Sequence, residues 1–203
     1  MTERLARQLA FLTEVDRMKS VLRQSPLMDK SRRENDAEHS WHIALMALTL
    51  REYAAADNVD IGRVMKMALV HDLVEIYAGD TFAYDTTGYE DKLEREQASA
   101  DRVFGLLPPD LGTEYRSLWE EFDRMETPDA LYASAIDRFQ PFFLNAKTDG
   151  YTWVRHGGIQ VSKVYQRMEP VRTAIPALWA FVEQVIRDAL EKGTRRLLEI
   201  SIQ

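Results

Sequence analysis

Residues 64–80 read VMKMALVHDLVEIYAGD, an apolar run that two adjacent polar residues, His71 and Asp72, interrupt. Ala68, His71 and Glu75 recur at three- and four-residue steps, so they share one face of a predicted helix, and Asp72 flanks that face about 100° further round. Burying a histidine beside an aspartate costs free energy unless the two are paired or hold an ion. The stretch therefore predicts a helix that places His71 and Asp72 in the core as a candidate functional site.

Helical periodicity also dominates the rest of the sequence. We expect Asp36 to be the N-cap of a helix that ends near residue 56, and Asp60 to cap the helix that contains His71 and ends near residue 78. Further helices are predicted over 5–18, 90–107, 111–125, 128–137, 159–168 and 176–192. The segments 80–89 and 145–158 lack a helical period and are expected to be loops. These patterns predict an all-α, single-domain helical bundle.

The composition limits the classes of function. The chain has 203 residues, 45% hydrophobic and 29% charged, with 26 Lys+Arg against 33 Asp+Glu and a net charge of −7. This acidic balance argues against a nucleic-acid polymer as partner, because domains that bind one usually carry a basic surface. No window approaches the roughly 20 apolar residues that span a bilayer, and the N-terminus lacks a signal-peptide pattern. We therefore expect a cytoplasmic protein with no membrane partner.

Two further polar residues fall in predicted helices. His39 lies in the first turn of the helix that begins near residue 36, and Asp137 interrupts the apolar stripe of ASAIDRFQPFF. Pro141 has no N–H to bond the Asp137 carbonyl, so the helix is expected to kink or open there. There is no cysteine, so any metal ion must be held by histidines and carboxylates.

The order His39, His71-Asp72, Asp137 resembles the H…HD…D signature of the HD-domain metal-dependent phosphohydrolases. The longer strings PLMDKSRRENDAEHS and HDLVEIYAGD resemble the branch that contains the bacterial 5′-deoxynucleotidases and their eukaryotic HD-domain relatives. The likeness covers about residues 9–145. It implies a bundle of the HD-domain type that forms one domain over residues 1–203, with C-terminal helices over 159–195 packed on the signature region.

The resemblance implies one divalent metal ion (Mn, Co, Zn, Fe or Mg) held by His39, His71, Asp72 and Asp137. Two imidazoles and two carboxylates form a mixed nitrogen and oxygen donor set that suits these ions. Such an ion polarises a phosphoryl group and lowers the pKa of bound water. The implied activity is hydrolysis of a small phosphorylated substrate by a metal-activated water. The implied substrate is a deoxyribonucleoside 5′-monophosphate, and the implied assembly is a homodimer.

Five other residues have expected roles in the reaction. Glu75, one helical turn beyond the histidine, matches the glutamate proposed as the family's catalytic acid or base, although an exposed carboxylate paired with a cation has the same spacing. Asp80 matches a substrate-side aspartate, and we expect it to bind substrate together with Thr81; a capping or turn role explains both equally well. Arg23 and Arg33 are expected to bind phosphate, because guanidinium groups match phosphate oxygens, whereas loop arginines are often merely solvated.

Several alternatives stay open. The deoxynucleotidases carry an Arg-Trp pair directly before Pro-Leu-Met, where this chain has Gln24-Ser25, so nucleotide selectivity does not carry over. A dNTP triphosphohydrolase, another phosphomonoester hydrolase of the superfamily and a non-catalytic helical module are the rival functions. A two-metal phosphodiesterase is disfavoured because no histidine occurs between His71 and His156. His42 is expected behind His39, and His156 in a loop over the site.

Overall fold

The structure, a computed structural model, describes residues 1–192 and 197–198 and is predominantly helical. Its α-helices are α1 Glu3–Val15, α2 Asp36–Thr49, α3 Ile61–Val70, α4 Glu75–Ala78, α5 Lys92–Phe104, α6 Pro109–Arg124, α7 Pro128–Lys147, α8 Tyr151–Arg155, α9 Val161–Ala174 and α10 Trp179–Glu191. Short 3₁₀ helices cover Asp16–Ser20, Arg51–Tyr53 and Pro176–Leu178. The predicted all-α class is confirmed.

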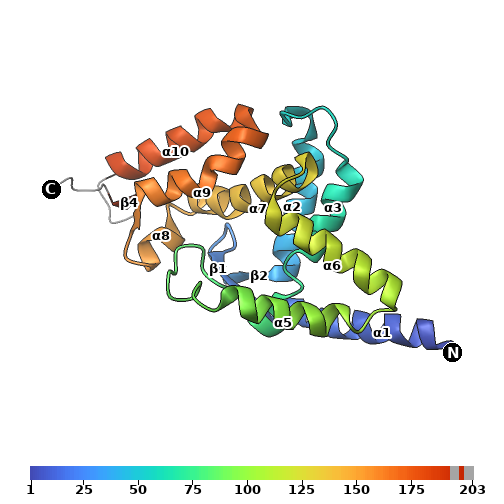
Figure 1. The fold of residues 1–203 in the computed structure, drawn as a ribbon. Coiled ribbons are helices and arrows are strands. Elements are labelled where there is room, and N and C mark those ends of the chain that lie inside the picture. Colours follow the sequence, from blue (N-terminus) through green and yellow to red (C-terminus); the bar gives the residue numbers. More distant parts are fainter. Residues whose placement is uncertain (193–196, 199–203) are drawn as a thin grey trace.

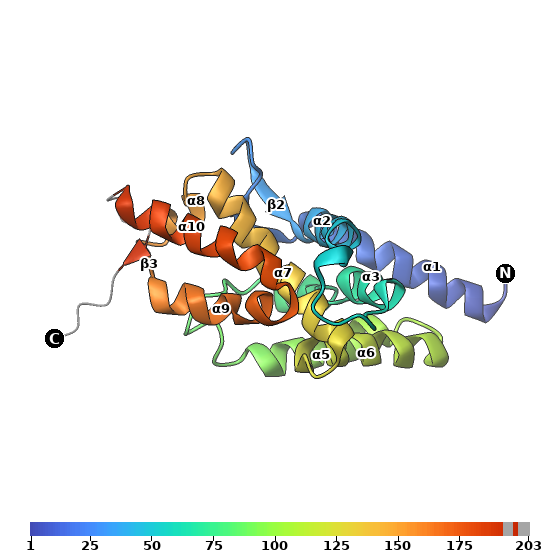
Figure 2. The ribbon, with the colours of Figure 1, turned by 90° about the horizontal axis from the view of Figure 1, so that it is seen from above.

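Helix α7 occupies the middle of the molecule and packs against α2, α3, α6 and α9 (Figure 1). Helices α1 and α10 lie at opposite ends, as both views show (Figures 1 and 2). The larger hydrophobic core fills the space between α2, α3, α7, α9 and α10. A second core joins α1, α5 and α6 to the segment that follows α3.

The stretch 64–76 belongs to both cores. Val64, Met67 and Ala68 are buried in the larger core, and Val70 and Val74 are buried in the second core. Between the two sets the chain leaves α3 and makes a turn over residues 71–74 before α4 begins. This break corrects the predicted continuous helix over 60–78. The turn therefore presents its polar side chains at the junction of the two cores.

The segment between α1 and α2 and the predicted loop 145–158 contain regular structure. The polar connection before α2 forms an antiparallel hairpin of β1 Leu22–Pro26 and β2 Arg33–Asn35. The predicted loop 145–158 contains α8, because the Asn145 side chain accepts a hydrogen bond from the backbone N–H of Thr152. A parallel pair, β3 Ile159–Gln160 and β4 Leu197–Leu198, ties the far end of the chain to the start of α9.

Helix ends also differ from the sequence prediction. The N-cap of α2 is Asn35, which forms a capping box with Glu38, so the prediction that Asp36 caps this helix is wrong. Because Asn35 supplies the capping oxygen, the side chain of Asp36 does not serve as the cap, and it is fully buried. Helix α7 continues past Pro141 to Lys147. The C-terminal helices α9 and α10 fall inside the predicted 159–195, of which residues 193–195 lie outside the described part of the chain.

Candidate metal centre

Four side chains from three elements converge at the junction of the two cores. His39 comes from the first turn of α2, His71 and Asp72 from the turn after α3, and Asp137 from the middle of α7. His39 Nε2 lies 3.0 Å from Asp137 Oδ1 and 3.8 Å from Asp72 Oδ2. His71 Nε2 lies 3.1 Å from Asp72 Oδ2 and 3.6 Å from Asp137 Oδ1. The tertiary structure thus brings together residues that the sequence separates by up to 98 positions.

The far nitrogen of each imidazole is held by a neutral acceptor. His71 Nδ1 donates to the Ala68 carbonyl at 3.0 Å, and His39 Nδ1 donates to Gln140 Oε1 at 3.1 Å. These two bonds assign the proton of a neutral imidazole to Nδ1, which leaves the lone pair of each Nε2 facing the carboxylates. The buried Nε2 atom of His71 has no hydrogen-bond partner. The two Nε2 lone pairs and the two carboxylates face one another, and together they are a suitable set of ligands for one divalent cation.

The two aspartates of the cluster keep their negative charge. Burial raises the pKa of Asp72, but the positive charges of His71 and Arg23 outweigh burial and lower this pKa well below the ordinary value. Burial likewise raises the pKa of Asp137, and the two imidazoles lower it well below the ordinary value. Burial lowers the pKa of His71, but Asp72 and Asp137 raise it to about 10. A positive charge at the cluster therefore stabilises the two carboxylates, and either a proton on an imidazole or a metal ion can supply it.

Glu75 lies beside this cluster in a second group of carboxylates. Oxygen atoms of Glu75, Asp36 and Asp72 lie within 4.8 Å of one another. Burial and the charge of Asp72 raise the pKa of Glu75 well above the ordinary value, and the same two causes raise the pKa of Asp36 to about 7. Two neighbouring carboxyl groups with raised pKa values can hold a proton near neutral pH. The sequence analysis assigned Asp36 only a capping role, because an aspartate at a helix start is usually a cap.

The two predicted phosphate-binding arginines occupy different environments. Arg23 Nη1 donates to Asp72 Oδ2 at 2.6 Å and to Asp36 Oδ1 at 3.3 Å, so its charge is already neutralised by the cluster. Arg33 donates to the backbone carbonyls of Arg23 and Leu22 and so ties the two strands of the hairpin together. Arg23 lines the cavity beside the cluster, whereas Arg33 is not among its lining residues.

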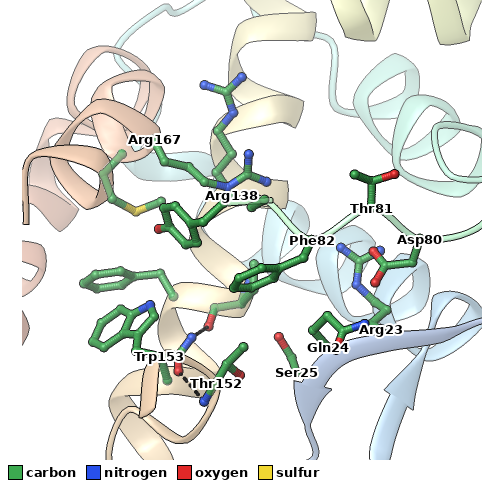
Figure 3. A pocket seen from close by; sticks show the side chains of 16 residues that line it. Arg23, Gln24, Ser25, Asp80, Thr81, Phe82, Arg138, Thr152, Trp153 and Arg167 are labelled. Carbon is green, nitrogen blue, oxygen red and sulfur yellow. Dashed lines mark hydrogen bonds between the residues drawn. The ribbon is translucent and has the colours of Figure 1, made fainter. Parts of the chain in front are cut away.

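A cavity of about 210 Å³ opens beside the cluster. Its walls include His71, Asp72, Glu75 and Asp137, together with both predicted substrate-side residues, Asp80 and Thr81. Figure 3 shows Asp80, Thr81 and Phe82 along the loop that faces Arg23, Gln24 and Ser25 of β1. Arg95 fixes this loop by donating to Thr81 Oγ1 and to the Ala78 and Gly88 carbonyls.

Residues behind the cluster complete the site. Gln140 Nε2 donates to Glu34 Oε1 at 2.7 Å and contacts His42 Nδ1 at 3.2 Å, which fixes the amide that holds His39. Glu34 and Gln140 were not recognised in the sequence; the position of Gln140 three residues after Asp137, on the same helix face, is the signal that identifies it. His156 stacks on Phe82 with ring centroids 3.9 Å apart and so covers the loop that bears Thr81.

The fold and the site together define the class of protein. The sequence profile of the HD domain matches residues 15–179, so the chain belongs to the HD-domain family. A predicted metal-dependent phosphohydrolase of known structure from Magnetospirillum magnetotacticum is 48% identical, with a TM-score of 0.88 over 95% of this chain and 98% of that one. The HD resemblance read from the signature residues is therefore confirmed.

Named relatives give a narrower comparison. The human 5′-deoxynucleotidase HDDC2 is 30% identical over 64% of this chain and 62% of its own length. The 5′-deoxynucleotidase of Erwinia tasmaniensis is 28% identical over 62% of this chain and 66% of its own length. The chain thus spans less than two thirds of these curated relatives. None of the described helices has both the length and the apolar character needed to cross a membrane.

Proposed function

We propose that this protein is a metal-dependent phosphohydrolase that removes the phosphate from deoxyribonucleoside 5′-monophosphates. The observation that carries the proposal is the convergence of His39, His71, Asp72 and Asp137, with each Nδ1 bonded to a neutral acceptor and each Nε2 facing carboxylates. The relatives named 5′-deoxynucleotidase support the choice of substrate.

The four residues are the proposed ligands of one divalent ion. Their donor set fits Mn²⁺, Co²⁺, Zn²⁺, Fe²⁺ or Mg²⁺, and the unpartnered Nε2 of His71 supports a cation at this point. A divalent ion bound there supplies Lewis-acid polarisation of the phosphoryl group and a water of lowered pKa. Gln140 and the Ala68 carbonyl keep the imidazoles in the orientation that binding requires.

Glu75 is the proposed proton carrier. Its buried Oε2 atom has no hydrogen-bond partner, and its side chain lines the same cavity as Asp72 and Asp137. The raised pKa favours the protonated form of Glu75, which can give its proton to the leaving 5′ oxygen. Asp36, whose carboxyl group lies beside Glu75, can share that proton.

The loop of Asp80 and Thr81 is proposed to contact the substrate. Both residues line the cavity of the cluster, and Arg95 holds the loop in place through Thr81 and two carbonyls. Asp80 Oδ2 is buried without a partner, so it is available to accept a hydrogen bond from a sugar hydroxyl.

A substrate panel tests the proposal. Protein loaded with each of Mn²⁺, Co²⁺, Zn²⁺ and Mg²⁺ is incubated with ribo- and deoxyribonucleoside mono- and triphosphates, and inorganic phosphate and tripolyphosphate are measured. Phosphate release from deoxyribonucleoside monophosphates is the expected result. Release of tripolyphosphate with untouched monophosphates would make the protein a triphosphohydrolase, and no release with any ion would make it a non-catalytic module.

We also propose that residues 1–203 act as one domain, as a homodimer in the cytoplasm. The packing of α9 on α7 and of α10 on α9 supports a single unit. The dimer follows from the family resemblance alone, and the compartment is the expectation drawn from the sequence. Light scattering on the purified protein measures the oligomeric state directly.

A further inference from the structure

Two arginines beside the cluster of His39, His71, Asp72 and Asp137 have no carboxylate partner in the described part of the chain. Arg138 follows Asp137 on α7, and Arg167 comes from the facing helix α9. Both line the cavity that contains His71 and Asp137. Figure 3 draws a neighbouring pocket that both arginines also line, and it shows the two side chains close to each other on the side away from Arg23. They also line the two neighbouring pockets, so they stand where these spaces meet.

Their contacts leave both charges uncompensated. Arg138 Nη2 contacts only a thioether, Met125 Sδ, at 3.2 Å. Burial and the positive charge of Arg167 lower the pKa of Arg138, with Asp137 and Asp123 opposing this more weakly. Among the residues that the structure describes, neither guanidinium forms an ion pair within 4.0 Å. Two adjacent cations in a half-buried position repel each other, and a bound anion removes that cost.

The other arginines near the site have partners. Arg23 bonds to Asp72 and Asp36, and Arg33 bonds to backbone carbonyls of β1. A substrate phosphate would have to displace these bonds in order to use either residue. Arg138 and Arg167 need no such exchange, because their donors are not committed to a carboxylate.

We propose that Arg138 and Arg167 form the site that binds the phosphate dianion of the substrate. The inference rests on the proposed function and assigns to this pair the role that the sequence suggested for Arg23 and Arg33. Two guanidinium forks supply enough N–H donors for the oxygens of one phosphate group. The shared cavity lets the same phosphate face His71, Asp72 and Asp137, three of the four proposed metal ligands. Arg23 is left as a positioning residue for Asp72.

Binding of inorganic phosphate to the Mn²⁺-loaded protein tests the pair without requiring turnover. Isothermal titration calorimetry is run on the wild type, Arg138→Gln, Arg167→Gln and Arg167→Lys. The matched control is Arg172→Gln, which removes an exposed arginine from the same helix α9. Circular dichroism and bound-metal analysis accompany each protein. We expect the phosphate dissociation constant to rise roughly ten- to a hundred-fold in both Gln variants, the scale of lost charge-assisted hydrogen bonds.

Each outcome decides the assignment. Arg167→Lys is expected to recover part of the affinity, and Arg172→Gln to leave it unchanged. If Arg138→Gln does not fold, the partly exposed Arg167 gives the decisive comparison. Unchanged phosphate affinity in folded, metal-loaded Arg167→Gln overturns the inference. If the Gln variants bind phosphate more weakly but the wild type hydrolyses no nucleotide, the anion site stands and the proposed function is wrong. If the wild type hydrolyses nucleotides but the Gln variants bind phosphate as well as the wild type does, the proposed function stands and the anion site is wrong.

Discussion

Arg23 Nη1 donates a hydrogen bond of 2.6 Å to Asp72 Oδ2, which joins the β1–β2 hairpin to the turn after α3. Both side chains are only 12% exposed. The same guanidinium lies 3.3 Å from Asp36, which is fully buried. One cation therefore compensates two carboxylates at the centre of the site, and its removal leaves both without that charge.

We predict that Arg23→Gln lowers the free energy of unfolding by about 3–5 kcal/mol, because it leaves buried carboxylates unpaired. Urea unfolding measures the loss. The control is Arg32→Gln, which removes an exposed pair with Glu38 and is expected to leave the stability nearly unchanged, because solvent screens such a pair. A normal stability of Arg23→Gln together with a raised KM would instead make Arg23 the phosphate-binding residue that the sequence suggested.

Asp72→Ala and Asp137→Ala are each predicted to abolish both the bound metal and the activity. Each change removes a carboxylate that faces both imidazoles. Elemental analysis of the purified variants measures the metal, and Asp188→Ala, an exposed position on α10, is the control. Full metal occupancy in both variants would show that the ion binds elsewhere.

Metal removal is predicted to lower stability without unfolding the protein, because the two cores lie on either side of the site. A metal ion that binds the folded protein and not the unfolded one raises the free energy of unfolding by about 2.7 kcal/mol when the free ion is at a hundred times its dissociation constant. Thermal melting with a chelator and with added Mn²⁺ measures the difference. Asp72→Ala should show no stabilisation by Mn²⁺, and an equal effect in that variant would contradict the assigned ligands.

Glu75→Gln is predicted to keep the metal and the substrate affinity while kcat falls by roughly 10²–10⁴, the usual scale for a lost general acid or base. Glutamine preserves the shape of the side chain and cannot carry the proton. Steady-state kinetics with metal analysis separate the outcomes, and Glu94→Gln on the exposed face of α5 is the control. Loss of metal would make Glu75 a ligand, and near-normal kinetics would move the search for the proton carrier to Asp80.

Asn35→Ala is predicted to cost about 1 kcal/mol, since it removes the capping box at the start of α2. His39 lies one turn further along this helix, so the change tests whether the cap also positions a metal ligand. Chemical unfolding and metal content are measured beside Asn58→Ala, which alters an exposed turn. A stable variant with normal metal content would assign no role to the cap.

Helical periodicity predicted the all-α class, and the resemblance of the signature residues to the HD domain implied the family and the four residues that meet at the cluster. Periodicity identifies buried faces, and a histidine or aspartate on such a face stands out because burying it is costly. This reasoning placed His39, His71 and Asp137 on helices or at their ends, as the structure has them. Local signals also located the starts of the predicted helices to within a few residues, whereas α2 ends well before the predicted residue 56, and α7 and α9 continue well past the predicted residues 137 and 168.

Which charges are compensated could be seen from the packing of the elements and not from the sequence. Whether an arginine can take a phosphate depends on the carboxylates that folding brings within reach, and these lie far away in the chain. Arg23 meets Asp72 across 49 positions, and Asp36 turns inward because Asn35 takes the cap. Arg138 and Arg167 face each other only because α9 packs on α7. Sequence periodicity predicts the helix face on which a residue lies. The residues that it contacts there depend on how the helices and strands pack against one another.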